Sequence, residues 1–146
     1  MNPADATTLR AMLADPSMCG VYAVEPGADD RYLEAARALD FAAIAIDFDG
    51  CGGKDDAIAR IAAALRFPAW FGGNWDALAD SLADLSWWPA PGYLLLLART
   101  DAWREADPFA FETLWAILED AAARWARERV PFWALLPTRD PERGPD

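Results

Sequence analysis

Hydrophobic positions along the chain fall into short continuous runs and into longer segments with helical spacing. The short runs are typical of β-strands bounded by turn residues, and they lie at 20–24, 42–48, 93–97 and 132–136. The run YLLLL at 93–97 is apolar at every position, which is typical of a parallel strand covered on both faces. The pattern therefore predicts a small, mostly parallel β-sheet of three to four strands.

Helices are predicted between these strands, where apolar residues recur three or four positions apart. The last begins at an Asp-Pro pair and is stopped by Pro131, whereas residues 1–18 are polar and weakly patterned. Strands that alternate with helices predict an α/β fold in which helices pack on the sheet. The predicted helices span 29–39, 54–66, 74–85 and 107–129.

A chain of 146 residues lies within the usual span of a single domain. We expect one domain over 1–136, with its core at about 42–136 and an N-terminal strand-helix extension over 1–41. We expect a disordered tail over 137–146. The extension has too few residues for a core of its own, so it is expected to extend the sheet and cover one edge.

The absence of histidine narrows the chemistry that this chain can perform. Histidine is the side chain most often used as a general acid or base, and Ser/His/Asp and Cys/His arrangements both require it. Cys19 and Cys51 cannot supply a four-ligand zinc site by themselves and are too sparse for a disulfide scaffold. We therefore expect no cofactor, no metal, no enzymatic activity and a reducing cytoplasmic environment.

The charge balance limits the kinds of partner. The chain has 24 acidic and 13 basic residues, which give a net charge of −11. Such a chain repels phosphate backbones and anionic lipids, so we expect no direct nucleic acid and no membrane partner, whereas a basic protein suits its charge. No signal peptide is visible, and no apolar run approaches the ~20 residues of a membrane span.

The helix predicted at 74–85 lies in a stretch, 67–98, that contains no lysine or arginine. Asn74 is a good N-cap for this helix. An ordinary solvated face is the simpler interpretation of its acids, yet like charges at i and i+4 destabilise a helix by about 0.2–0.5 kcal/mol per pair. A local conflict of this kind is expected at a functional site. On a helical wheel the acids Asp76, Asp80 and Asp84 lie almost opposite the apolar stripe of Trp75, Leu78, Leu82 and Leu85.

Two aromatic residues, Trp70 and Phe71, precede this helix and are followed by Gly72 and Gly73. Such rings can pack in the core or staple the start of the helix, or one of them can be exposed as an interface hot spot. The glycines allow either a tight chain path into Asn74 or a close approach of the backbone to a partner. These alternatives stay open at the level of the sequence.

The segment FPAWFGGNWDALADSL, followed by SWWP, an apolar strand, a long helix and VPFWALL, resembles the barstar family of intracellular ribonuclease inhibitors over about 42–136. The resemblance implies an inhibitor that places this loop and helix in the basic cleft of a ribonuclease, with its carboxylates at the positions of substrate phosphates. It further implies a cytoplasmic immunity or antitoxin role against a basic extracellular-type or toxin ribonuclease, with no small-molecule substrate. The partner-binding residues that it implies are Trp70, Phe71, Gly72, Asn74, Asp76, Ala77 and Asp80.

The sequence departs from the family prototype at some of these positions. Trp70 and Phe71 stand where the prototype has two tyrosines, and Gly73 replaces an acidic residue. The last helix of the prototype contributes an acidic residue, to which Glu119 or Asp120 could correspond. The mode of action therefore transfers better than the identity of the partner.

Two other functions stay open from the residues alone. The segment IAIDFDG places Asp47 and Asp49 at a strand end in the D-x-D-G order of haloacid dehalogenase-type phosphohydrolases, which use such residues as nucleophile and acid. Those enzymes also need a downstream lysine, and Lys54 is the only lysine in the chain. The simpler interpretation is that both aspartates close the strand and turn the chain. The second alternative is a non-inhibitory adaptor that binds another basic protein through its acidic surface.

Overall fold

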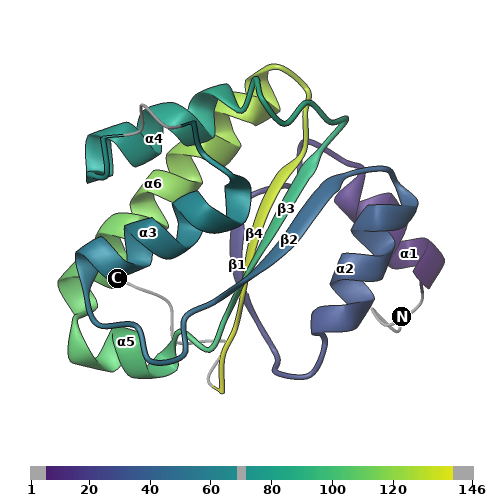
Figure 1. Ribbon diagram of the computed structural model, residues 1–146. Coiled ribbons are helices and arrows are strands. Elements are labelled where there is room, and N and C mark those ends of the chain that lie inside the picture. Colours follow the sequence, from purple (N-terminus) through teal and green to yellow (C-terminus); the bar gives the residue numbers. More distant parts are fainter. Residues whose placement is uncertain (1–5, 69–71, 140–146) are drawn as a thin grey trace.

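In the computed structural model, which describes residues 6–68 and 72–139, four parallel strands form one sheet with helices on both faces (Figure 1). Every neighbouring pair of strands is parallel. The predicted α/β fold with a small, mostly parallel sheet is therefore confirmed. The strands are β1 (Val21–Val24), β2 (Ala42–Asp47), β3 (Tyr93–Ala98) and β4 (Phe132–Pro137), in the order β1-β4-β3-β2 across the sheet.

The helices divide between the two faces of the sheet, with α1 and α2 on one face and α3, α4 and α6 on the other (Figure 1). The order of the strands explains this division. From β1 the chain crosses the whole sheet to β2, and then returns through β3 to β4. Because parallel crossovers are right-handed, reversing the direction of travel moves the connecting helices to the opposite face. The helices are α1 (Ala6–Leu13), α2 (Asp29–Ala38), α3 (Lys54–Leu65), α4 (Trp75–Asp84), α5 (Asp101–Ala106) and α6 (Pro108–Arg127).

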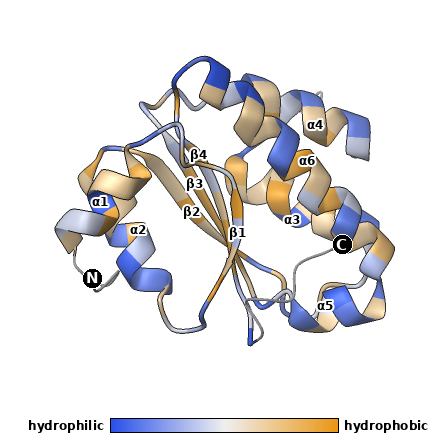
Figure 2. Cartoon of the chain, turned by 180° about the vertical axis from the view of Figure 1, so that it is seen from behind, coloured by the Kyte–Doolittle hydropathy of each residue, from blue (hydrophilic) through white to orange (hydrophobic). Residues whose placement is uncertain are grey.

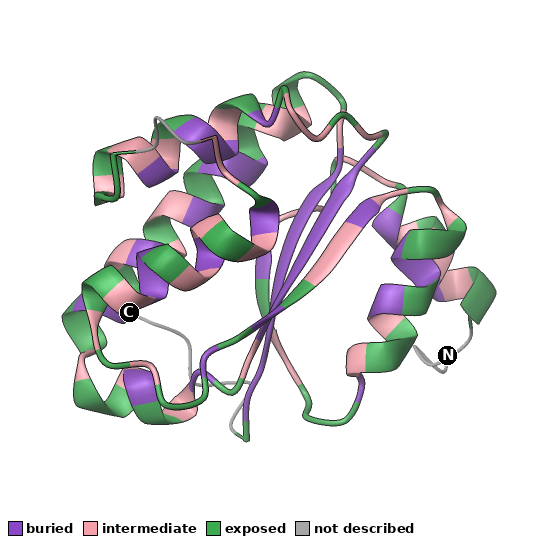
Figure 3. Cartoon of the chain, in the orientation of Figure 1, coloured by how far each residue is buried: buried purple, intermediate pink, exposed green. Residues whose placement is uncertain are grey.

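Alternate residues of β3 supply two hydrophobic cores. Leu95 and Leu97 pack with α3, α4 and α6, whereas Leu94 and Leu96 pack with α1 and α2. All four leucines are fully buried, as the apolar run predicted (Figure 3). In Figure 2, hydrophilic residues lie on the outer sides of the helices, while the strands between the two layers are mostly hydrophobic.

The N-terminal extension contains a helix, a strand and a second helix, so the expectation of a strand and one helix missed α1. Leu9 and Leu13 lie one helical turn apart and are both buried, but a helix of eight residues carries too short a pattern for a sequence-based prediction. The indole N–H of Trp133 on β4 donates a hydrogen bond of 2.9 Å to the carbonyl of Leu13. Strand β1 extends the sheet beside β4, as expected. Helix α2 covers a face of the sheet and not an edge, because its buried residues pack against β2 and β3.

The chain is ordered beyond the expected start of the C-terminal tail at residue 137. Strand β4 includes Pro137, and the buried hydroxyl of Thr138 donates to a carboxylate oxygen of Asp101 at 2.5 Å. This bond joins the end of β4 to α5, a short helix that the sequence pattern did not predict. The remainder of the expected tail, 140–146, lies outside the described residues.

Candidate functional site at the start of helix α4

The start of α4 is fixed by a side-chain cap. The Asn74 side-chain oxygen accepts a hydrogen bond of 2.7 Å from the backbone N–H of Ala77, which confirms the predicted N-cap. Gly73, immediately before the cap, has a φ of +72°, a left-handed conformation that glycine adopts without steric cost. The glycine therefore serves the entry of the chain into the helix.

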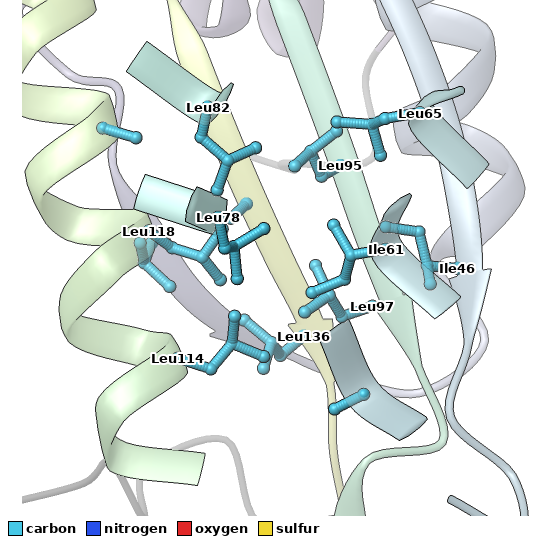
Figure 4. Close-up of a cluster of buried hydrophobic side chains, with 14 of the residues drawn as sticks. Ile46, Ile61, Leu65, Leu78, Leu82, Leu95, Leu97, Leu114, Leu118 and Leu136 are labelled. Carbon is cyan, nitrogen blue, oxygen red and sulfur yellow. The ribbon is translucent and has the colours of Figure 1, made fainter. Parts of the chain in front are cut away.

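The acidic residues of α4 lie on its outer face, as the helical wheel predicted. Asp76 and Asp80 are exposed, while Leu78 and Leu82 are fully buried. Figure 4 shows Leu78 and Leu82 in the hydrophobic cluster that also contains Leu118 of α6. Neither the Asp76 nor the Asp80 carboxylate forms a hydrogen bond or an ion pair with a described residue. Both charges are thus available to a partner.

Helix α6 holds the C-terminal end of α4. The indole N–H of Trp125 donates to the carbonyl of Leu82 at 2.8 Å, and the Nε of Arg124 donates to the carbonyl of Ala83 at 3.3 Å. The last carbonyls of a helix have no partner within the helix, so these two donors satisfy groups that would otherwise lack one. Arg124 also brings a positive charge to the negative end of the α4 dipole. The segment 67–98 contains no lysine or arginine, so this positive charge comes from a helix that is distant in the sequence.

The described part of the site brings five of the seven predicted residues together at the first turns of α4. These are Gly72, Asn74, Asp76, Ala77 and Asp80. A Cβ at Gly72 would lie 3.6 Å from the Ala77 side chain, which is ordinary contact, so packing alone does not require glycine there. The other two predicted residues, Trp70 and Phe71, lie outside the described residues.

Two acidic residues of α6 were candidates for a further contact, and both Glu119 and Asp120 are exposed. Asp120 precedes Arg124 by four residues and therefore lies on the same flank of the helix. Arg124 reaches across to α4 from that flank. Glu119 lies about 100° from Asp120 around the helix axis, so the packing of the two helices leaves Asp120 nearer to α4 than Glu119.

Asp47, the last residue of β2, and Asp49, in the turn that follows, both form ion pairs with Arg99. The Asp47 carboxylate accepts from the Nε of Arg99 at 3.0 Å and from the backbone N–H of Asp49 at 2.9 Å. The backbone bond from Asp49 and the hydrogen bond from Arg99 lower the pKa of Asp47. Arg60 of α3 donates to the backbone carbonyls of Asp47 and Asp49 at 2.9 and 2.7 Å. These contacts fit the simpler interpretation, in which the aspartates turn the chain.

The described residues contain no group of three or more His, Cys, Asp or Glu side chains placed to hold a metal ion. No helix within 6–68 and 72–139 is both long and apolar enough to cross a membrane.

Comparison with known protein families finds a match over the larger, C-terminal part of the chain. The family described as Barstar (barnase inhibitor) matches residues 41–137, which run from just before β2 to the end of β4 and include the whole of α4. A search of curated proteins found no match. The matched segment agrees closely with the resemblance seen in the sequence over 42–136, and α1, β1 and α2 precede it. Because the match covers more than half of the chain, this protein belongs to the Barstar (barnase inhibitor) family, whose members are non-enzymatic inhibitors.

Proposed function

We propose that this protein inhibits a barnase-type ribonuclease by placing the outer face of α4 in the basic active-site cleft of the enzyme. Membership of the family implies a barnase-type ribonuclease inhibitor. The observation that carries the detailed proposal is the pair of exposed carboxylates, Asp76 and Asp80, which lie one helical turn apart and have no described partner. The remaining binding residues are proposed to be Trp70, Phe71, Gly72, Asn74 and Ala77.

The carboxylates would act electrostatically. A ribonuclease cleft binds phosphates through arginine and lysine side chains, and a carboxylate can form the same charge-assisted hydrogen bonds. The Asn74 cap and the Trp125 hydrogen bond hold α4 at both ends. Association therefore orders little of this helix, which reduces its entropic cost. Asp120, on the α4 side of α6, is proposed as a supporting acidic contact.

The partner is proposed to be a basic ribonuclease of the extracellular or toxin type, and the role to be immunity against it. The net charge of −11 suits such a partner. We also propose that the protein acts in the cytoplasm, since Cys19 and Cys51 are both free thiols and the fold does not depend on a disulfide.

The phosphohydrolase alternative is wrong for this chain. Members of the family are non-enzymatic inhibitors. The carboxylate of Asp47, which would have been the nucleophile, is instead paired with Arg99. The adaptor alternative binds another basic protein and inhibits no ribonuclease, so a test with a ribonuclease separates the two.

The test uses purified barnase-type ribonucleases and the Asp80→Ala variant. The parent protein is expected to inhibit at least one of these enzymes, and Asp80→Ala is expected to lose about 2–5 kcal/mol of binding free energy because it leaves cations of the cleft buried and unpaired. Its unfolding free energy should stay unchanged or rise slightly, since alanine is the better helix former and one like-charge pair is removed.

Asp84→Ala is the matched control. It removes the same charge from the same stripe, but at the end of α4 farthest from the capped first turn, where Ser86 donates to the carboxylate at 2.9 Å. Inhibition should change much less than in Asp80→Ala. If the parent inhibits no barnase-type ribonuclease, the protein is an adaptor. If Asp80→Ala inhibits as well as the parent, the stripe is only a solvated face.

A further inference from the structure

An open pocket of about 370 Å³ lies at the carboxyl ends of the strands, next to α5. Its lining comes from all four strand ends, through Gly27 after β1, Asp49 after β2, Arg99 after β3 and Arg139 after β4. The volume falls within the range of small-molecule sites. In Figure 1 α5 and α4 are at opposite ends of the molecule, so this pocket is separate from the surface proposed to bind the ribonuclease.

The pocket lies where the segments that follow two of the strands leave the sheet toward opposite faces. The segment after β1 leads to α2 on one face, and the segment after β3 leads to α5 and α6 on the other. Strand β4 lies between β1 and β3 and ends at Pro137. Open parallel sheets bind ligands in the crevice formed at such a switch point. Pro26, Gly27 and Asp29 precede the matched segment 41–137, so the N-terminal unit completes this crevice.

Two arginines present free donors to the pocket. Arg139 contacts Asp101 through Nε at 3.4 Å, and its terminal nitrogens have no partner among the described residues. Arg99 uses Nε and one terminal nitrogen on Asp47, while its other terminal nitrogen forms an ion pair with Asp49 at 3.8 Å, which leaves its N–H donors without a hydrogen bond to a described residue. The two side chains are 64% and 81% exposed for Arg99 and Arg139, respectively. Guanidinium groups with free N–H donors are suited to a phosphate.

Within the described part of the chain, two carboxylates beside these donors accept no side-chain hydrogen bond, although Asp49 is held in an ion pair with Arg99 at 3.8 Å. Asp101 is satisfied by Thr138 and Arg139, whereas Asp29 and Asp49 accept no side-chain hydrogen bond from a described residue. An ionised carboxylate only accepts hydrogen bonds, so it requires a donor such as a sugar hydroxyl. It would also repel a bare anion. The ligand that satisfies both halves of the pocket therefore carries a phosphate at one end and hydroxyl groups at the other.

We propose that this pocket binds a small phosphorylated sugar, either free or as the sugar phosphate of a mononucleotide. The phosphate contacts Arg99 and Arg139, and the hydroxyl groups donate to Asp29 and Asp49. A carboxylate that binds ribose hydroxyls beside a phosphate site is a recurrent arrangement at sheet switch points. The site does not depend on the proposed ribonuclease inhibition, because it lies away from α4.

Calorimetric titration of the full chain tests this proposal, with ribose 5-phosphate and adenosine monophosphate as probes. Ribose 5-phosphate is expected to bind more tightly than either inorganic phosphate or ribose. Arg139→Ala and Asp29→Asn should each weaken binding by about tenfold or more, the cost of one charge-assisted hydrogen bond. Arg127→Ala, which removes an exposed arginine from the end of α6, is the matched control and should leave the affinity unchanged.

The outcomes are distinct. Equal binding of the two probes identifies a free sugar phosphate as the ligand, and tighter binding of adenosine monophosphate identifies a mononucleotide. Inorganic phosphate binding as tightly as ribose 5-phosphate would overturn the proposal, because the hydroxyl half of the site would then contribute nothing. Absence of binding of both probes at millimolar concentration, or binding that survives Arg139→Ala, would overturn it as well.

Discussion

The indole N–H of Trp125 on α6 donates a hydrogen bond to the carbonyl of Leu82 on α4, at 2.8 Å. Together with the hydrogen bond from Arg124 to the carbonyl of Ala83, this contact ties the last turn of the proposed inhibitory helix to α6. The Trp125 ring also packs against Tyr93 at the start of β3, with the ring centres 5.2 Å apart. The position of α4 is therefore coupled to the sheet through one tryptophan side chain.

Trp125→Phe is expected to destabilise the protein by about 1–3 kcal/mol, because the carbonyl of Leu82 loses its donor while most of the aromatic ring is kept. Urea unfolding measures this loss. Trp88→Phe is the control, since the half-buried Trp88 packs against the same Tyr93 ring but its indole N–H bonds to no described residue. Equal losses in the two variants would show that the hydrogen bond contributes little.

The N-terminal unit is expected to be essential for folding. A chain that starts at Asp40 would expose Leu94, Leu96 and Trp133, which α1 and α2 cover, and would open the edge of β4. It should unfold at a lower denaturant concentration than the full chain or fail to fold. If it unfolds at the same midpoint, the unit is only an appendage.

Leu13→Ala tests the same packing within the full chain. Leu13 is fully buried, so its truncation should cost about 2–5 kcal/mol of unfolding free energy. Met18→Ala is the control, because Met18 belongs to the same unit but is 48% exposed. Its effect should be within about 0.5 kcal/mol, as is usual for surface substitutions.

Asp101 is expected to contribute a pH-dependent part of the stability. Burial acts to raise the pKa of Asp101, but hydrogen bonds from the Thr138 hydroxyl and the Arg139 N–H outweigh it and hold the pKa below the ordinary value. A lowered folded-state pKa gives stability that is fully present above the unfolded value of about 3.9 and is lost as the pH falls through the folded value.

The measurement compares the unfolding free energy of the parent and of Asp101→Asn between neutral pH and acid. The parent should be the more stable above the unfolded aspartate pKa, and the difference should shrink as the pH falls below it. A difference that stays constant down to acid pH would show that the ionised carboxylate is not what stabilises this corner.

Much of the fold follows from the sequence because its signals are local. The all-apolar run of β3 and the helical spacing of α3 and α6 each predict their own element, and the Asn74 cap predicts where α4 begins. Helices α1 and α5 have eight and six residues, so each offers only one or two buried positions to a periodicity argument. Their stability comes from tertiary contacts, as Trp133 to Leu13 and Thr138 to Asp101 illustrate.

The candidate site likewise has features that local sequence patterns predict and features that they do not. The outward direction of Asp76 and Asp80 follows from the helical period, but Arg124 at the C-terminal end of α4 does not, because it is brought there by the packing of α6. The sequence pattern also did not predict the pairing of Asp47 with Arg99, since Asp47 ends β2, Arg99 follows the neighbouring strand β3, and the two residues are 52 positions apart in the chain. Contacts of this kind depend on strand order, which local patterns do not specify.

The proposed inhibition should be fast and strongly dependent on salt. A chain with a net charge of −11 that approaches a basic cleft is accelerated by long-range attraction, and salt screens this attraction over about 8 Å at physiological ionic strength. The association rate constant should therefore fall steeply between low and physiological salt, while the dissociation rate constant changes less, because short contacts govern it.

Stopped-flow association at several salt concentrations measures this effect, and two charge-removing variants locate its source. Asp76→Asn should slow association at low salt, because it removes charge from the face that enters the cleft. Glu34→Gln removes one charge from an exposed position of α2, on the opposite face of the sheet, and should slow association much less. An association rate that does not respond to salt would reject the charged-cleft mechanism. Equal slowing by both variants would mean that net charge, and not the α4 surface, steers the encounter.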